Sequence, residues 1–158
     1  MGLAGQLIRE GFPDAFVECT EERGEECVRV HPEGIAAVAR FLKEDPRLDF
    51  NVLMDLAGVD YPDEEPRFEI VYHFYALARK ARLRVKVRVP EARPEVDSLT
   101  PLWKAADWHE REAWDLFGIR FKGHPNLKRI LLYEEFEGHP LRKDYPIRKR
   151  QPRIGPLN

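Results

Sequence analysis

The sequence contains few of the residues from which catalytic and cofactor sites are usually built. Its two cysteines cannot form a disulfide framework, and an iron–sulfur cluster needs about four thiolates. Ser98 is the single serine and lies outside any Gly-x-Ser-x-Gly elbow, and the glycines match neither common phosphate-binding motif. No stretch approaches the roughly 18 consecutive apolar residues of a membrane span, and no secretory segment follows Met1. These absences argue against a redox, nucleotide-binding or membrane-spanning chain, and they predict reduced thiols in a cytosol-like compartment.

Charge is abundant but unevenly distributed along the chain. The net charge is −2, yet residues 1–70 carry −10 and residues 71–158 carry +8. From Gly138 onward six basic residues stand against one acid, Asp144. A basic tail favours an anionic partner, namely nucleic acid, a membrane surface or an acidic protein face, although a self-docked tail fits equally well. A pI near 6.2 argues against a general nucleic-acid binder.

Hydrophobic periodicity predicts an α+β domain. Helical spacing and capping residues predict helices over 3–12, 32–46, 101–106 and 108–117, the last closed by Gly118. Apolar or alternating runs predict strands over 15–19, 26–30, 50–59, 68–77 and 82–89. The strand–helix–strand step requires a crossover and a parallel pair, whereas hairpins require antiparallel pairs. We therefore expect a two-layer domain over residues 1–135, with a mixed, mostly antiparallel sheet and helices packed on it.

Two strands and the tail differ in the environment that we expect for them. Residues 50–59 are apolar at nearly every position, which is typical of a strand covered on both faces. Residues 82–89 alternate strictly between apolar and basic side chains, so one face is buried and the other is either a solvated surface or a docking strip for anions. Residues 136–158 are rich in proline and arginine with few apolar side chains, which predicts an extended arm.

The histidines do not form a metal-binding pattern. His109, His124 and His139 are spaced fifteen apart, which matches no common ligand motif. Two of them lie in Gly-His-Pro turns, where an imidazole usually bonds to the local backbone. We therefore expect no metal ion in this chain.

The densest charge cluster lies on the predicted helix 108–117. A stand-alone enzyme would use Glu110, Glu112 and His124 as acid–base groups converging on one pocket. Structural roles explain the same residues, because Arg111 and Asp115 have the spacing of a helix ion pair and Asp107 with Glu110 resembles a capping box. The large aromatic residues of this helix exceed what one buried face holds, which favours contact with another protein.

Two motifs then carry a family resemblance. Residues 110–131 read EREAWDLFGIRFKGHPNLKRIL, and residues 138–146 read GHPLRKDYP. Together they resemble the signature of the C subunit, or "30-kDa" subunit, of respiratory complex I, NADH:quinone oxidoreductase. The resemblance implies a non-redox peripheral-arm subunit with no catalytic residues and no cofactor of its own, FMN and the iron–sulfur clusters being held by partner subunits. It also implies the D subunit, together with the B and I subunits, as partners, a place on the cytoplasmic face of the bacterial inner membrane, no nucleic acid, and membrane association only through the complex.

The resemblance implies that the arm over residues 136–158 docks on partner subunits. It also implies partner-interface roles for a set of charged and aromatic signature residues. They are Glu110, Arg111, Glu112, Asp115, His124, Lys128, Arg129, His139, Arg142, Lys143, Asp144 and Tyr145. Arg129 and Arg142 are suited to bidentate contacts with partner carboxylates.

Other functions remain open on the sequence. The same family includes relatives linked to ferredoxin, F420H2 or hydrogenase, and the chain would then be the equivalent subunit there. The stand-alone enzyme described above is a second hypothesis. An adaptor that binds anionic lipid through the basic arm is a third.

Overall fold

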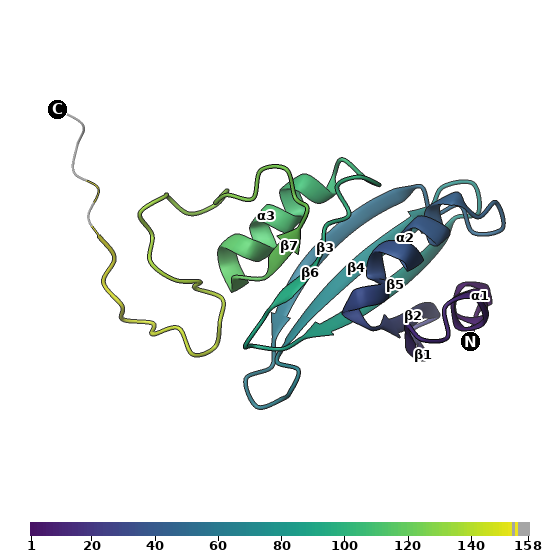
Figure 1. The fold of residues 1–158 in the computed structure, drawn as a ribbon, viewed down its shortest axis with the longest axis horizontal. Helices are drawn as coiled ribbons and strands as arrows, with labels where there is room; N and C mark the ends of the chain where they lie inside the picture. The colour runs from purple at the N-terminus through teal and green to yellow at the C-terminus, as the bar shows by residue number, and fades with distance from the viewer. Residues whose placement is uncertain (153, 155–158) are drawn as a thin grey trace.

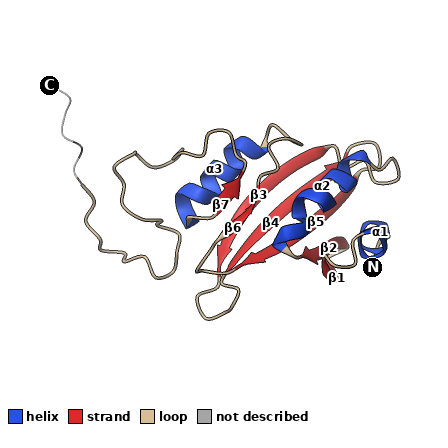
Figure 2. Cartoon of the chain, in the orientation of Figure 1, coloured by secondary structure: helices blue, strands red, loops and turns tan. Residues whose placement is uncertain are grey.

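A five-stranded sheet with helices on one face forms the centre of the molecule, as Figure 1 and Figure 2 show. The computed structural model describes residues 1–152 and 154. The strands are β1 (Phe16–Glu22), β2 (Glu25–Val30), β3 (Val52–Asp60), β4 (Phe68–Ala76) and β5 (Ala81–Val89). The helices are α1 (Leu3–Gly11), α2 (Ile35–Glu44) and α3 (Ala106–Phe117), with a short 3-10 helix η1 (Pro32–Gly34) before α2. Two short strands, β6 (Glu95–Asp97) and β7 (Arg120–Lys122), form a separate parallel pair.

The order of strands in the sheet is β1-β2-β5-β4-β3, and it combines both kinds of pairing. β2 runs parallel to β5, whereas β1–β2, β5–β4 and β4–β3 are antiparallel. The chain leaves β2 through η1 and α2 and reaches β3 at the opposite edge, so the crossover spans the sheet. The predicted α+β fold with a mixed, mostly antiparallel sheet is therefore confirmed. The described residues include no helix that is both long and apolar enough to span a membrane.

The core lies between the helices and one face of the sheet. Helix α2 buries Ile35, Val38, Ala39 and Leu42 at the predicted helical spacing. The apolar side chains of β5 alternate as predicted and are buried against it. Removing this apolar surface from water is the main favourable contribution to folding.

The other face of the sheet is open and carries charges that pair with one another. Glu69 of β4 is only 2% exposed, because Arg29, Lys86 and Arg88 surround its carboxylate at 3.8–3.9 Å. The basic residues of β5 are thus balanced by acids on neighbouring strands. The expectation that residues 50–59 are covered on both faces was wrong, since β3 is an edge strand and Met54 is 47% exposed.

The segment before α3 is not the predicted helix over 101–106. Residues 100–105 form turns, and α3 begins directly afterwards at Ala106. Trp103 determines this path, because its ring packs on Phe74 at 5.1 Å and its Nε1 donates a hydrogen bond to the carbonyl of Asn51. Burial of one large aromatic side chain has overridden local helix propensity here.

Tyr72 provides a test of this core. Its side chain is completely buried, and its hydroxyl has no hydrogen-bond partner among the described residues. A buried hydroxyl without a partner is destabilising, so Tyr72→Phe should raise the free energy of unfolding by about 1 kcal/mol in urea titrations. The control Tyr75→Phe, on the open face, should change it by less than about 0.5 kcal/mol. A destabilised Tyr72→Phe variant would show that the hydroxyl is hydrogen-bonded in solution.

Candidate functional site

The charged motif on α3 lies at the junction between the sheet and the chain that follows it. Glu110 and Asp115 are fully buried, and Arg111 is 9% exposed. Burying charged groups is costly unless they are paired or hydrogen-bonded. The partners of these three side chains therefore define what the motif does.

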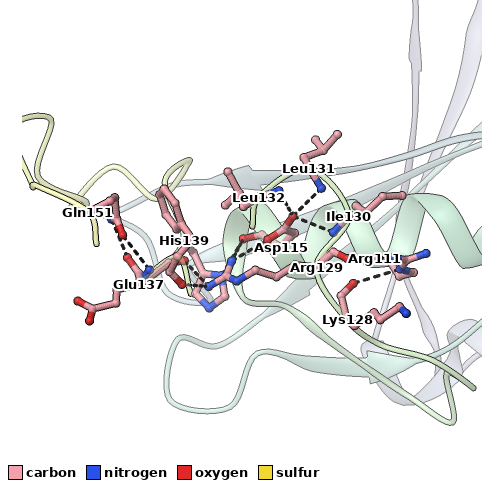
Figure 3. Close-up of polar contacts among 12 residues, drawn as sticks. Arg111, Asp115, Lys128, Arg129, Ile130, Leu131, Leu132, Glu137, His139 and Gln151 are labelled. Atoms are coloured by element: carbon pink, nitrogen blue, oxygen red, sulfur yellow. Dashed lines mark hydrogen bonds and ion pairs between the residues drawn. The ribbon is translucent and has the colours of Figure 1, made fainter. Parts of the chain in front are cut away.

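Asp115 binds the backbone of the segment after β7. One carboxylate oxygen accepts hydrogen bonds from the amides of Ile130, Leu131 and Leu132 at 2.9–3.1 Å, as Figure 3 shows. The other oxygen receives the Arg129 guanidinium at 2.6 Å. Burial alone would raise the pKa of this carboxyl, but the Leu132 amide and the other donors outweigh it and hold the pKa below its usual value.

Arg129 connects this carboxylate to the chain further on. Its Nη2 donates to the carbonyls of Phe136 at 2.7 Å and Gly138 at 3.1 Å, and its guanidinium lies 5.5 Å from the centre of the Phe136 ring. The Arg129 guanidinium, which we expected to bind partner carboxylates, is thus already hydrogen-bonded within the chain. The Arg129 side chain is only 13% exposed.

Arg111 points away from Asp115 and binds the same segment from another side. Its guanidinium donates to the carbonyls of Lys128 and Arg129 at 3.1 and 2.9 Å (Figure 3). The predicted ion pair between Arg111 and Asp115 was therefore wrong. The i, i+4 spacing was present, but both side chains serve the backbone of a segment beyond the helix.

Glu110 holds the segment that precedes α3. Its carboxylate accepts hydrogen bonds from the Ser98 hydroxyl and the Leu99 amide, both at 2.6 Å. Burial raises the pKa of this carboxyl to about 7. The predicted capping box with Asp107 was wrong, because α3 has Ala105 at its N-cap and no side-chain cap.

The two histidines of the Gly-His-Pro turns bind backbone, but only His124 makes a local contact of the kind that the sequence indicated. His124 accepts from the Asn126 amide through Nδ1 and directs Nε2 to the Asp107 carbonyl at 3.2 Å. His139 directs Nδ1 to the Asp115 carbonyl at 2.9 Å, and burial lowers the pKa of this imidazole. Among residues 1–152 and 154 there is no cluster of three side chains able to hold a metal ion.

A second buried charge network fastens the strap, the name we use for residues 128–152. Arg67 forms a bidentate pair with Asp60 at 2.7 and 2.8 Å, and this pair holds the pKa of Asp60 below its usual value. Two further carboxylates pair with Arg67: Asp144 of the strap at 2.9 Å and Glu91 at 2.7 Å. Asp60 also accepts the Lys143 amide at 2.6 Å. Sequence reasoning missed Asp60 and Arg67, which flank the Pro-bounded loop between β3 and β4 without any periodic signal.

Arg142 completes the attachment of the strap. Its Nε donates to the Phe117 carbonyl at 2.6 Å, and its guanidinium lies over the Phe68 ring at 4.8 Å. Gly118 makes room for it: this residue ends α3 with φ 76°, as predicted, and a Cβ here would lie 2.6 Å from the Arg142 guanidinium. Glycine is required both for the left-handed conformation and for the close approach.

The three acid–base groups of the stand-alone enzyme hypothesis do not come together in the structure. Glu110 faces Ser98, whereas His124 faces Asp107 and Glu112 is exposed on α3. A hollow of about 290 Å³ opens on the sheet near Met54, His73 and Arg84, and none of the signature residues lines it. The stand-alone acid–base enzyme is therefore not supported, because its three groups do not converge.

Comparison with known proteins identifies the class of protein that this arrangement resembles. Residues 28–151 match the family model described as the respiratory-chain NADH dehydrogenase, 30 Kd subunit. The C subunit of the NADH-quinone oxidoreductase from Roseiflexus sp. (strain RS-1) is 54% identical over 90% of this chain and 82% of its own. The protein of the same name from Citrifermentans bemidjiense is 48% identical over 96% of this chain and 94% of its own.

Two solved structures share the fold. The trypsin-resistant fragment of Nqo5 superposes with a TM-score of 0.67 at 33% identity, covering 77% of this chain and 97% of the fragment. A chain of the membrane-bound sulfane sulfur reductase, an archaeal respiratory membrane complex, superposes with a TM-score of 0.75 at 26% identity, covering 90% of this chain and 83% of the other.

Asp115→Asn tests whether this carboxylate holds the strap. The neutral amide forms no ion pair with Arg129 and turns its NH2 donor toward other donors. Breaking a buried pair should lower the free energy of unfolding by about 3 kcal/mol and expose residues 128–145 to protease. The Asp115 pKa is lowered on folding, so the deficit should be complete above the ordinary value of 3.8 and shrink as pH falls through the lower folded value. Glu112→Gln, on the exposed side of α3, is the control. If Asp115→Asn proved as resistant to protease as Glu112→Gln, Asp115 would not hold the strap in place.

Glu110 predicts a pH dependence of the opposite sign. Between its ordinary value of 4.5 and about 7, the folded chain keeps a proton that the unfolded chain has lost, so stability falls as pH rises. Glu110→Gln should match wild type near pH 5 and exceed it above pH 7 by an amount on the order of 3 kcal/mol. Urea titrations from pH 5 to 8 measure the difference. Parallel curves for the two proteins would show that Glu110 titrates normally.

Proposed function

Because the chain belongs to the family of the 30 Kd subunit of respiratory-chain NADH dehydrogenase, we propose that it is the C subunit, a non-redox component of the peripheral arm, of a proton-translocating NADH:quinone oxidoreductase. In this proposal the chain positions other subunits and performs no chemical step. FMN and the iron–sulfur clusters belong to those subunits.

The proposal rests on the hydrogen-bond partners of the charged signature residues on α3. Arg111 and Asp115 bind backbone groups of the strap and fix it against α3. Glu110 binds the Leu99 amide and fixes the segment that precedes α3. Such groups build a defined surface instead of a reactive centre. A binding segment that is already ordered loses less conformational entropy when it associates with a partner.

The proposed partners are the D subunit, which helps to form the quinone site, and the B and I subunits, which hold iron–sulfur clusters. The remaining exposed signature residues, Lys128, Lys143 and Glu112, are available for these contacts. Trp108, which is 59% exposed and lies beneath the Arg111 guanidinium, is suited to the same surface. The complex would hold the chain at the cytoplasmic face of the bacterial inner membrane.

One comparison supports a second candidate. The likeness to a chain of an archaeal sulfane sulfur reductase shows that this fold also occurs in a respiratory complex with another name. The alternative is the equivalent subunit of a relative linked to ferredoxin, F420H2 or hydrogenase. The NADH-quinone oxidoreductase names of the 48–54% identical relatives favour the first candidate.

Copurification and activity in the native membrane test the proposal. A tag on the D subunit should recover this chain in near-equal amount, and deleting the chain should abolish quinone reduction by NADH. Reduction of ferricyanide by NADH, which reports the flavin alone, should survive in the detached flavin subunit. Recovery of the chain with a complex that oxidises reduced ferredoxin but not NADH would favour the second candidate. Absence of the chain from both complexes would contradict the proposed function.

A further inference from the structure

The strap presents an apolar side chain at the tip of a tight turn. Residues 146–149 form this turn, closed by a hydrogen bond from the Lys149 amide to the Pro146 carbonyl at 3.0 Å. Ile147 occupies its second position and is 100% exposed. Scattered exposed apolar residues are common, but Ile147 exposes its whole side chain to water, so a partner that buried it would gain free energy.

The base of this turn is fastened by contacts within the strap. The Glu137 carbonyl accepts hydrogen bonds from Gln151 at 3.1 Å, Lys149 at 3.3 Å and Tyr145 at 3.4 Å. Gln151 also receives the Glu137 amide at 2.9 Å, as Figure 3 shows, and it donates to the Tyr145 hydroxyl. The Tyr145 ring stacks on Phe136 with centroids 6.1 Å apart. These contacts at the base therefore hold the turn, with Ile147 at its tip, in an ordered conformation.

Several cations lie close to the tip in sequence, and one of them, Lys149, is already paired with Glu137 at 3.7 Å. The exposed side chains of Lys143, Arg148 and Arg150 form no ion pair within the part of the chain that the structure describes. Asp144, the single acid of this stretch, is already paired with Arg67. The surface of the turn thus combines one apolar side chain with several unneutralised positive charges.

We propose that the turn at residues 146–149 inserts Ile147 into an apolar pocket rimmed by carboxylates on a protein partner. The inference rests on the proposed function, because it assumes that the chain works inside a larger complex. A buried apolar contact enclosed by polar contacts that exclude water is the usual anatomy of an interface hot spot. The cations match a rim of carboxylates and select against partners with basic surfaces.

A protein pocket fits these features better than a membrane surface does. Membrane anchoring by an unmodified segment uses a broad apolar face, commonly of an amphipathic helix, whereas this turn offers one isoleucine at its tip. A rigid turn gains little at a fluid surface but lowers the ordering cost in a shaped pocket. Lipid binding through the cations alone is the competing outcome, and the experiment below separates the two.

Retention on the native complex tests the proposal with a matched pair of variants. Ile147→Asp should reduce the chain retained after a wash by about tenfold or more, because burying an isoleucine changes an affinity by a factor of roughly ten to a hundred. The control Leu77→Asp alters another exposed apolar residue, 59% exposed, at the turn after β4, and should be retained like wild type. Arg148→Glu should be released at lower salt than Arg120→Glu, a matched exposed cation on β7.

The outcomes separate this inference from the proposed function. A wild-type chain that does not copurify with the complex would overturn both. A wild-type chain that copurifies, together with equal retention of Ile147→Asp, would overturn the inference and leave the proposed function standing.

A photo-crosslinking residue at position 147 identifies what the tip contacts in the membrane-bound complex. An adduct with another protein subunit supports the proposal. An adduct with lipid alone, or none while the chain stays bound, overturns it. Circular dichroism of each purified variant shows whether the domain has kept its fold, so that loss of retention is read as loss of contact.

Discussion

The structure of the second half of the chain depends on the buried carboxylate of Asp115. It replaces water for three successive backbone amides and a guanidinium at once, and this lets an irregular segment lie against α3 with its polar groups satisfied. An irregular segment has no ladder of its own hydrogen bonds, so without such an acceptor it would need solvent. The strap begins at this attachment, and the Arg129 contacts to Phe136 and Gly138 extend it further along the chain.

The sheet and α2 could be predicted from the sequence because their signals are local. Alternation over residues 82–89 and helical spacing from Ile35 to Leu42 both reflect a single buried face, and a single face is what periodicity reports. Residues 50–59 were misjudged because an apolar run does not distinguish a central strand from an edge strand. The predicted helix before α3 failed because Trp103 packs on the sheet, a contact that spacing cannot report.

The charged motif could be located but not interpreted from spacing alone. Arg111 and Asp115 have the separation of a helix ion pair, and Glu110 has that of a capping residue, yet all three bind segments distant in sequence. Contacts of this kind, from a side chain to distant backbone groups, produce no periodic pattern in the sequence. Their role as a partner interface, which the family resemblance implies, stays a prediction for those side chains that remain exposed.

The pair of Asp60 and Arg67 has a consequence for the order in which the molecule forms. Its two strap contacts join residues 77 and 83 positions apart, so neither can exist before β3 and β4 are aligned. Closing so long a loop loses considerable entropy and is rewarded only when both ends are already in place. The strap therefore docks late in folding, after the sheet. A newly synthesised chain would therefore hold the strap in this arrangement only once β3 and β4 have paired.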